Sequence, residues 1–397
     1  MELAEYGRFG KTGVRRLVYT PEWSDAMAAC RAWAEKAGLE TRIDAVGNLW
    51  ARLAGRVEGS AFVTGSHIDS QKSGGRYDGA LGAIAGILSL AALKEQFGTP
   101  ERSLEAVVLC EEEGSRFPTA GFWGSRAIVG KTTVEDTQTT LDFNGETIGA
   151  AMREVGLDPV RVGEAKRDDI AGFIELHIEQ GPVLEDAGRP VAIVDAITGI
   201  AQFEVSLVGE QNHAGAFPMD LRRDPMAGFA EIASRVIDHA HRLGRPAVTT
   251  VGRCHVDPGG SAIIPRQVQF SIDARHPDPE TRQRIYAVHE ALIKEVADRR
   301  GLAAHIRKMI DLEPCLCDPL LLDALSRAAE RHGIPTLTMP SGAGHDAQQM
   351  SLVCPTAMVF VRSAGGRSHT PEEFSTIADC TDGIRVVAEG LRILAYR

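Results

Sequence analysis

Residues 61–93 read AFVTGSHIDSQKSGGRYDGALGAIAGILSLAAL and contain the pattern that decides the fold. The apolar run Ala61–Gly65 is typical of a buried strand, and Ala80–Leu93 has the small and aliphatic residues of a helix that packs closely on a sheet. His67 and the Asp78-Gly79 turn lie in the loop between them. This order of strand, loop and helix predicts an α/β domain, in which loops at strand ends carry the chemistry.

The same arrangement of an apolar strand followed by metal-binding side chains recurs along the chain. The later instances are Glu112 and Glu113 after 104–110, His177 after 172–176, and His369 shortly after 357–361. Imidazoles and carboxylates from several strand ends could together hold two divalent ions that share one carboxylate. We therefore interpret the chain as a two-metal hydrolase.

Each of these motifs also has an ordinary structural explanation when it is taken alone. His67 and Asp69 could form a surface pair, Glu111–Glu113 a solvated loop, and His177 a buried core histidine. His369 could simply precede a helix that Thr370 caps, with Glu373 completing a capping box. That all of these explanations hold at once, each at a strand end, is improbable.

The length of 397 residues exceeds that of a typical single hydrophobic core, so two domains are expected. Near residue 199 the pattern changes to half-exposed strands and amphipathic helices. The strands are expected at 202–208 and 268–272, and the helices at 225–243 and 278–300. We predict a catalytic domain at 1–198 and 315–397, interrupted by a smaller α+β domain at 199–314.

Charge and composition exclude several classes of function. A formal net charge of −11 argues against a surface for nucleic acid or anionic membranes, both of which need clustered basic residues. The seven cysteines form no CxxC pair, which favours free thiols over a disulfide framework. No signal peptide and no apolar run long enough to span a bilayer is apparent, so a cytoplasmic location is expected.

The residue types also predict individual roles. His67 could bind a metal ion while Asp69 holds its other ring nitrogen and so fixes the ring. Asp78 has two carboxylate oxygens, as a ligand shared by two ions requires. Of the adjacent Glu112 and Glu113, one could be a ligand while the other faces the substrate and carries a proton.

Nearly the whole chain resembles the M20-type amidohydrolases, in the branch of N-carbamoyl-L-amino-acid hydrolases, allantoate amidohydrolases and β-ureidopropionases. The resemblance rests on RLVYTPE (16–22), GSHIDS (65–70), GGRYDG (74–79), EEGSRF (112–117), ELHIEQGP (175–182), NHAG (212–215), GAGHDAQ (342–348) and SHTPEE (368–373). It implies a zinc-exopeptidase-like catalytic domain, with a mixed sheet flanked by helices, and an inserted α+β lid or dimerisation domain.

The resemblance also implies which residues bind metal. His67, Asp78 and His177 would hold one ion, and Asp78, Glu113 and His369 the other, with Asp78 shared. Zinc, manganese, cobalt and nickel all suit such ligands. Glu112 would be the general base for a water bridging the ions, which leaves Glu111 without a role.

Substrate recognition is implied to involve both domains. His213 in the insert would polarise the substrate carbonyl, often across a homodimer, and Arg275 would bind the substrate carboxylate. Gln180, His345 and Arg222 match positions that contact the ligand or the domain junction. Ala262 stands where this branch usually has asparagine, so the substrate could carry an apolar group there, or Ser261 or water could replace the amide.

The expected activity is hydrolysis of a linear, non-peptide C–N bond in a small molecule, such as an N-carbamoyl amino acid or an allantoate-like compound. An N-acyl-amino-acid amidohydrolase or dipeptidase of the same superfamily is the alternative enzyme, which Ala262 favours slightly. A metal-stabilised ligand-binding protein is the non-enzymatic alternative, against which an intact Glu112 argues.

Overall fold

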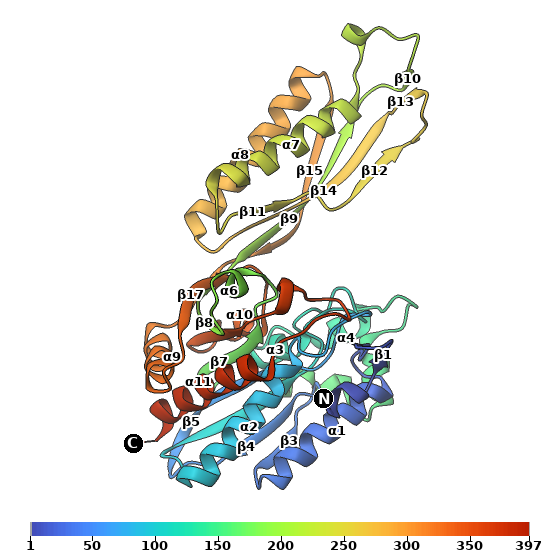
Figure 1. The fold of residues 1–397 in the computed structure, drawn as a ribbon. Coiled ribbons are helices and arrows are strands. Elements are labelled where there is room, and N and C mark those ends of the chain that lie inside the picture. Colours follow the sequence, from blue (N-terminus) through green and yellow to red (C-terminus); the bar gives the residue numbers. More distant parts are fainter. Residues whose placement is uncertain (1, 397) are drawn as a thin grey trace. The chain divides into compact units, whose positions relative to one another are not determined.

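The computed structural model describes residues 2–396, and the chain divides into two compact units (Figure 1). The first unit comprises the chain up to Asp195, Cys317–Met339 and the chain from His345 onward. The second unit comprises Ala196–Leu316 and Pro340–Gly344. The predicted roles of the insert, as a lid and as a dimer contact, stay predictions.

The first unit alternates strands with helices, as the sequence predicts. Before the insert its elements are η1 (Glu2–Glu5), β1 (Arg8–Phe9), β2 (Gly13–Val14), α1 (Pro21–Lys36), β3 (Glu40–Ile43), β4 (Leu49–Leu53), β5 (Val57–His67), α2 (Ala80–Phe97), β6 (Arg102–Leu109), α3 (Trp123–Ile128), α4 (Val134–Thr139), α5 (Ile148–Glu154), η2 (Pro159–Ala165), β7 (Ile170–Ile178), α6 (Val183–Asp186) and β8 (Val191–Ile197). The chain continues with β16 (Cys315–Leu316), the last two residues of the Ala196–Leu316 segment, and then with α9 (Pro319–Arg331), β17 (Thr336–Ser341), α10 (Asp346–Met350), β18 (Thr356–Val361), η4 (Ala364–Gly366) and α11 (Ile377–Ala395).

The main sheet is mixed and has nine strands in the order β16-β8-β18-β7-β5-β6-β4-β3, with β17 pairing to β8. The central strands β18, β7, β5 and β6 are parallel to one another, whereas β4 runs antiparallel to β6 and β8 runs antiparallel to β18. Because parallel strands end at the same edge, the loops after β5, β6, β7 and β18 are brought together. This confirms the predicted mixed α/β architecture.

Helices cover both faces of this sheet. In β7, the side chain of Leu176 lies beside Gly383 of α11. The carboxylate of the preceding residue, Glu175, accepts the backbone N–H of Ala347 in α10. Because side chains alternate between the two faces of a strand, α11 and α10 lie on opposite faces. His177 is two residues beyond Glu175 and so lies on the α10 face, at the end of the strand.

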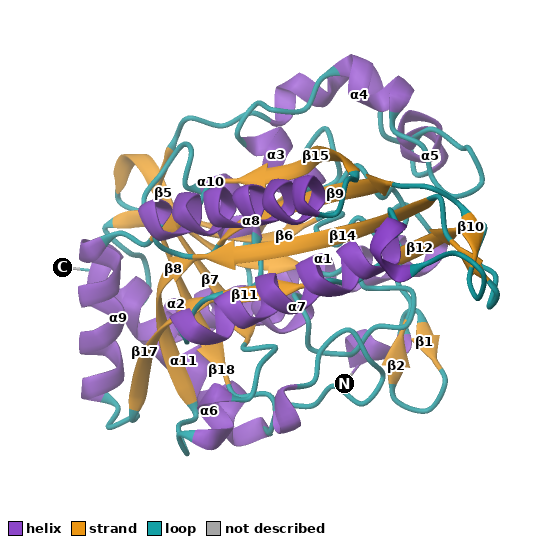
Figure 2. Ribbon diagram, turned by 90° about the horizontal axis from the view of Figure 1, so that it is seen from above, coloured by secondary structure: helices purple, strands orange, loops and turns teal. Residues whose placement is uncertain are grey.

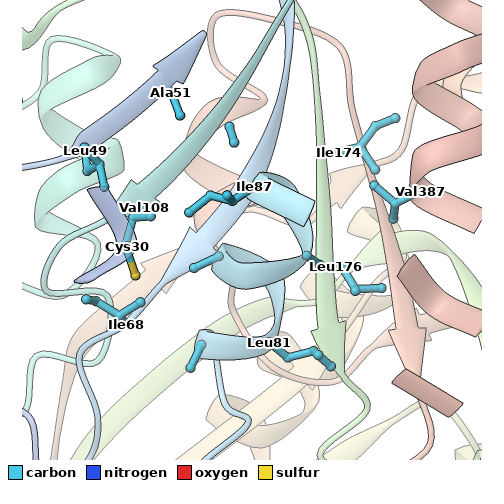
Figure 3. Packing of buried hydrophobic residues seen from close by; sticks show 14 of the residues in the cluster. Cys30, Leu49, Ala51, Ile68, Leu81, Ile87, Val108, Ile174, Leu176 and Val387 are labelled. Atoms are coloured by element: carbon cyan, nitrogen blue, oxygen red, sulfur yellow. The ribbon is translucent and has the colours of Figure 1, made fainter. Parts of the chain in front are cut away.

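Helix α2 forms the centre of the apolar core. Figure 3 shows Leu81 and Ile87 of α2 among apolar side chains from the strands and from α11, including Leu176 and Val387. Among the described helices, α2 alone has the length and apolar composition of a membrane-crossing segment, but 56% of that stretch is buried within the fold. Its contacts with β5, β6, β7 and α11 are those of a core helix.

The second unit packs two helices against a five-stranded sheet of order β11-β14-β9-β15, with β12 also pairing to β14 (Figures 1 and 2). Its elements are β9 (Gly199–Val208), β10 (Asn212–His213), η3 (Met219–Leu221), α7 (Pro225–Leu243), β11 (Val248–Thr250), β12 (Cys254–Asp257), β13 (Ile263–Ile264), β14 (Gln267–His276), α8 (Pro279–Arg299) and β15 (Ala303–Leu312). The buried positions of β9 and β14 alternate along each strand and face the helices.

The predicted helices of the insert are confirmed as α7 and α8. Asp224 and Asp278 cap their first turns by accepting backbone N–H groups, and a proline follows each cap. Strand β15 was not predicted from the sequence, because most of its side chains are exposed and apolar residues do not alternate along it. The backbone pairing of β15 with β9 is what makes it a strand.

Candidate active site

The predicted metal-binding side chains of the first unit gather at one edge of the main sheet. His67 is the last residue of β5 and His177 the penultimate residue of β7, whereas the other three lie in loops. Asp78 directly precedes the glycine that caps α2, Glu113 follows β6, and His369 follows β18 and η4. Four parallel strand ends therefore supply residues that are up to 302 positions apart in the sequence, from His67 to His369.

Asp78 lies at the centre of this group, and its two carboxylate oxygens face different partners. Oδ1 is 3.2 Å from Nε2 of His177 and 3.7 Å from Nε2 of His67. Oδ2 is 3.4 Å from Nε2 of His369, and that nitrogen is also 3.4 Å from Oε2 of Glu113. The Asp78 carboxylate thus lies between two groups of side chains, His67 and His177 on one side and Glu113 and His369 on the other; its role as a shared ligand stays a prediction.

The two sets have the chemistry and the spacing of a divalent metal site. His67, Asp78 and His177 each offer a ligand atom within 4.8 Å of the others, and so do Asp78, Glu113 and His369. Imidazole nitrogens and carboxylate oxygens are ligands that zinc and related transition metals accept. The residues present therefore fit the cations that the sequence implies.

Gly79 allows the turn that carries Asp78 to lie close to the imidazole of His67. Its φ angle is +61°, and a Cβ at this position would lie 2.3 Å from Nε2 of His67. Any side chain there would therefore collide with the imidazole and push Asp78 away from it. The backbone N–H of Gly79 also points to Nε2 of His177, at 3.2 Å.

Asp69 holds the glutamate loop as well as the histidine. Nδ1 of His67 lies 3.1 Å from the backbone oxygen of Asp69 and 3.6 Å from its Oδ1. The Asp69 carboxylate accepts the backbone N–H groups of Glu112 and Glu113, at 3.2 and 3.1 Å. Nδ1 of His67 is thus nearer to the backbone oxygen of Asp69 than to the carboxylate that the sequence suggests as its partner.

The three successive glutamates differ in their surroundings. Oε2 of Glu112 lies 3.6 Å from Nε2 of His67, so this carboxylate faces the metal-binding groups. Glu111, expected to have no role, is fully buried, and its Oε1 accepts the backbone N–H groups of Arg116 and Phe117. Glu111 therefore fixes the turn that follows the two glutamates facing the site.

Burial and opposite charges compete at these groups. Burial would raise the pKa of Asp78, but the imidazoles of His177 and His369 hold it well below its usual value. Burial raises the pKa of Glu112 well above its usual value, although His67 opposes the shift. The hydrogen bond to Asp78 raises the pKa of His369 to about 9. The site is therefore a cluster of strongly interacting charges, as functional sites often are.

Gln180 and His345 of the first unit lie beside the ligand groups. Nε2 of Gln180 donates to Oδ2 of Asp78 at 2.9 Å. The ring of His345 packs edge-on against that of His177 with centroids 4.6 Å apart. Burial, followed by the nearby His177, holds the pKa of His345 well below its usual value. Both residues thus contact the predicted metal-binding side chains directly, and their roles in substrate binding stay predictions.

Three further residues contact the predicted metal-binding groups, although no role at this site was predicted for any of them from the sequence. Gln71 donates from Nε2 to Oε2 of Glu113 at 2.6 Å, and the Ser368 hydroxyl donates to Oδ2 of Asp78 at 2.8 Å. The Glu373 carboxylate accepts the backbone N–H of Asp78 at 3.0 Å. The only available signal was that each residue follows or precedes a motif histidine or aspartate closely in the sequence.

A cavity of about 360 Å³ adjoins the second set of ligands. Its lining includes Glu113 and His369 together with Gln71, Lys72 and Phe143. Nζ of Lys72 lies 3.1 Å from the centre of the Phe143 ring. The cavity could hold a small molecule next to the metal-binding groups.

The remaining predicted residues belong to the second unit, where each has a local partner. His213 is exposed, and its Nδ1 accepts the N–H groups of Gly215 and Ala216. Arg222 donates to the backbone oxygens of Ala214 and Phe217.

Arg275 donates from Nε and Nη2 to the two carboxylate oxygens of Asp273, at 2.7 and 3.2 Å, and from Nη1 to the Gly342 oxygen. Ala262 is exposed, and its backbone oxygen accepts the N–H of Ala214. The substrate-binding roles of His213, Arg222, Arg275 and Ala262 stay predictions.

Known proteins resemble this chain over nearly its full length. Residues 63–392 match the family described as Peptidase family M20/M25/M40. The chain is 41% identical to an allantoate amidohydrolase of Bacillus subtilis (strain 168), covering 99% of this chain and 96% of that one. It is 38% identical to an N-carbamoyl-L-amino acid amidohydrolase of Geobacillus stearothermophilus, covering 98% and 95%.

A solved structure agrees with these sequence matches. The crystal structure of an amidase of the hydantoinase/carbamoylase family from Burkholderia multivorans superimposes with a TM-score of 0.92 at 34% identity, covering 100% of this chain and 96% of that one. The family and the ligand groups together indicate a divalent-metal-dependent enzyme. The chain belongs to peptidase family M20, among relatives that are amidohydrolases of linear amides.

Proposed function

We propose that the chain is a metal-dependent amidohydrolase that cleaves a linear, non-peptide C–N bond of an N-carbamoyl amino acid or an allantoate-like compound. The observation that carries this proposal is the placement of Asp78, whose two oxygens face two separate sets of ligands. Relatives that match the chain at 37–41% identity over 98–100% of its length are named for these two substrate classes.

We assign His67, Asp78 and His177 to one ion and Asp78, Glu113 and His369 to a second. Zinc, manganese, cobalt and nickel are the candidates, because all accept mixed imidazole and carboxylate ligands. Divalent cations held by such residues lower the pKa of a water molecule and polarise a carbonyl group.

Glu112 is our candidate for the group that moves the proton. Its carboxylate lies within 3.6 Å of His67, and the Asp69 carboxylate holds its backbone N–H. Glu112 would take a proton from the attacking water and return it to the leaving nitrogen. A positioned acid–base group contributes about 10²–10⁴-fold to a rate.

Substrate binding is assigned to residues of both units. Arg275 would bind the substrate carboxylate, because a guanidinium can donate two parallel hydrogen bonds to it. His213 would donate to the oxygen of the carbonyl as negative charge develops there, in a homodimer across to the neighbouring subunit's site. Gln180 and His345 would contact the substrate beside Asp78 and His177. Arg222 would hold the loop of His213, whose backbone it already contacts.

The hydrolysis of an N-carbamoyl amino acid would yield the amino acid, ammonia and carbon dioxide. An N-acyl amino acid would instead yield a carboxylic acid and the amino acid, without ammonia. Ala262 favours the second class, because its methyl side chain offers no hydrogen bond to a polar substrate group. Release of ammonia together with the amino acid therefore distinguishes the first activity from the second.

The test is a screen of the enzyme after chelation and reloading with Mn²⁺, Zn²⁺, Co²⁺ or Ni²⁺. Ammonia and free amino acid are both measured with N-carbamoyl, N-formyl and N-acetyl amino acids, allantoate and dipeptides. We expect metal-dependent release of ammonia from a ureido substrate. Release of amino acid alone would favour the acylase or dipeptidase alternative, and inert protein with every metal would favour a binding protein.

Two accompanying predictions are also proposals. Homodimerisation through the second unit is consistent with the exposed position of His213. A cytoplasmic location is consistent with the seven cysteines, which form no CxxC pair in the sequence.

A further inference from the structure

Glu373 does not have the local role that its sequence suggests. No helix begins at Thr370; α11 begins at Ile377, and Thr376 caps it. The side chain of Glu373 is buried and reaches the turn before α2 instead. Its Oε1 accepts the backbone N–H groups of Tyr77 and Asp78, at 2.8 and 3.0 Å. A residue 295 positions away thus holds the backbone of Asp78.

Ser368 connects the other oxygen of Glu373 to the Asp78 carboxylate. The Ser368 hydroxyl lies 3.0 Å from Oε2 of Glu373 and 2.8 Å from Oδ2 of Asp78. A hydroxyl has one proton to donate, so it can serve only one of these two acceptors at a time. Ser368 can therefore turn to Glu373 and release Oδ2 of Asp78 from one of its two hydrogen bonds, the other being donated by Gln180, without losing its own hydrogen bond.

Gly75 provides the space for this carboxylate. A Cβ at residue 75 would lie 2.2 Å from Oε1 of Glu373 and 2.4 Å from its Cβ. No side chain fits at residue 75 unless Glu373 moves. The chain thus accommodates a buried carboxylate next to a second one, Asp78, an arrangement that costs free energy unless a cation or hydrogen bonds compensate it.

We propose that Glu373 is a positioning residue for metal binding, acting through the backbone of Asp78 and through Ser368. We call Glu373, Ser368 and the two amides of Tyr77 and Asp78 the Glu373 clamp. The clamp fixes the turn so that the two oxygens of Asp78 face the two sets of ligands, and it gives Ser368 an alternative acceptor. The inference rests on the proposed function, in which Asp78 is the ligand shared by both ions.

The principal test is metal binding by the Glu373→Ala and Glu373→Gln variants. Equilibrium dialysis with Mn²⁺ and titration with Co²⁺, followed by visible absorption, report on the ligands directly. We expect Glu373→Ala to weaken metal binding about 10–100-fold, the range for residues that orient metal ligands. Glu373→Gln should lose less, because its amide oxygen can still accept the two backbone N–H groups.

Two further variants separate the clamp from general stability. Glu372→Gln is the matched control, because Glu372 is adjacent and exposed and bonds to Thr370 rather than to Asp78. It should bind metal as the wild type does. Gly75→Ala keeps every polar group of the clamp but displaces Glu373, and it should weaken metal binding as Glu373→Ala does.

Wild-type metal affinity and an unchanged Co²⁺ spectrum in Glu373→Ala and Gly75→Ala would overturn the proposal. A lowered melting temperature with unaltered metal affinity would also overturn it, because the role would then be structural only. If Glu373→Ala does not fold, the nearly isosteric Glu373→Gln and Gly75→Ala give the answer. Failure of the proposed function is seen separately, as a metal-loaded wild type that hydrolyses no amide.

Discussion

The two units place their predicted functional residues in opposite ways. In the first unit, His67, Asp78 and His177 are buried, and each is within 4 Å of another group of the same cluster. In the second unit, His213 is exposed and Arg275 is paired with Asp273. The first unit therefore holds its candidate metal-binding side chains close together, whereas Arg275, a proposed substrate-binding residue of the second unit, already has a local partner. Metal binding and substrate binding should accordingly respond to different mutations.

The largest expected effect is that of Glu112→Gln in the first unit. The amide cannot accept a proton, so kcat should fall by about 10²–10⁴-fold. Metal content should stay at the wild-type level, because the contacts that hold the loop come from the backbone N–H groups of residues 112 and 113. Measuring kcat together with bound metal tests both statements. Near-full activity would remove Glu112 from its assigned role.

A heterodimer of two inactive subunits tests whether His213 acts across a dimer. One subunit carries Glu112→Gln and the other His213→Ala, each with its own affinity tag, and the mixed dimer is isolated on both tags. If His213 serves the neighbouring subunit's site, one of the two sites is intact, and about half of the wild-type activity returns. A heterodimer as inactive as its parents would place His213 in its own subunit's reaction or outside the reaction.

Arg275→Lys tests substrate recognition by the second unit. Lysine cannot reproduce the two parallel hydrogen bonds that arginine can give to a carboxylate. We expect kcat/KM to fall about 10–100-fold for a substrate with a free carboxylate, mostly through KM, from the loss of hydrogen bonds to a charged group. Metal affinity should not change.

The matched control for Arg275→Lys is the substrate with its carboxylate converted to an amide. Wild type and variant should hydrolyse the amide substrate at similar rates, because this substrate has no carboxylate with which residue 275 could form an ion pair. An equal loss on both substrates would show that residue 275 supports the fold of the strand, through Asp273, rather than the substrate.

The sequence predicts the positions of helices and strand ends well where the pattern that marks them lies within the element itself. The strand ends that precede His67, Glu113, His177 and His369 could be identified from apolar runs alone. The helices 225–243 and 278–300 could likewise be predicted from their amphipathic pattern, and in the structure aspartate caps and prolines mark their first turns. Local hydrogen bonding and periodic burial produce both signals.

The sequence could not predict contacts that the fold makes between distant segments. Glu373 has the spacing of a capping box with Thr370, but its carboxylate is used by the Asp78 turn instead. Asp69 is two residues from His67, yet its carboxylate accepts amides from a loop more than 40 residues away. Strand β15 is exposed and is defined by its pairing with β9. In each case a backbone partner that is remote in sequence decides the outcome.

The smallest expected effect concerns the free energy of unfolding of the second unit. Its dependence on pH would distinguish the second unit from the first. His289 of α8 is buried beside His239 of α7, with ring centroids 5.6 Å apart, and neither of its ring nitrogens has a hydrogen-bond partner among the described residues. Burial, reinforced by His239, lowers the pKa of His289 to about 4, whereas an unfolded histidine has a pKa of about 6.5. Between these values the unfolded chain binds more protons than the folded chain.

The free energy of unfolding of the second unit should therefore fall as the pH decreases from about 6.5 to 4, by about 3 kcal/mol in total. His289→Leu, which replaces the imidazole with an apolar side chain that does not titrate, should remove most of this dependence. Hydrogen exchange of α7 and α8, compared between variant and wild type at each pH, measures it. Fluorescence of the four tryptophans, all in the first unit, provides the internal reference. An unchanged pH dependence in α7 and α8 would show that other groups control the acid sensitivity of this unit.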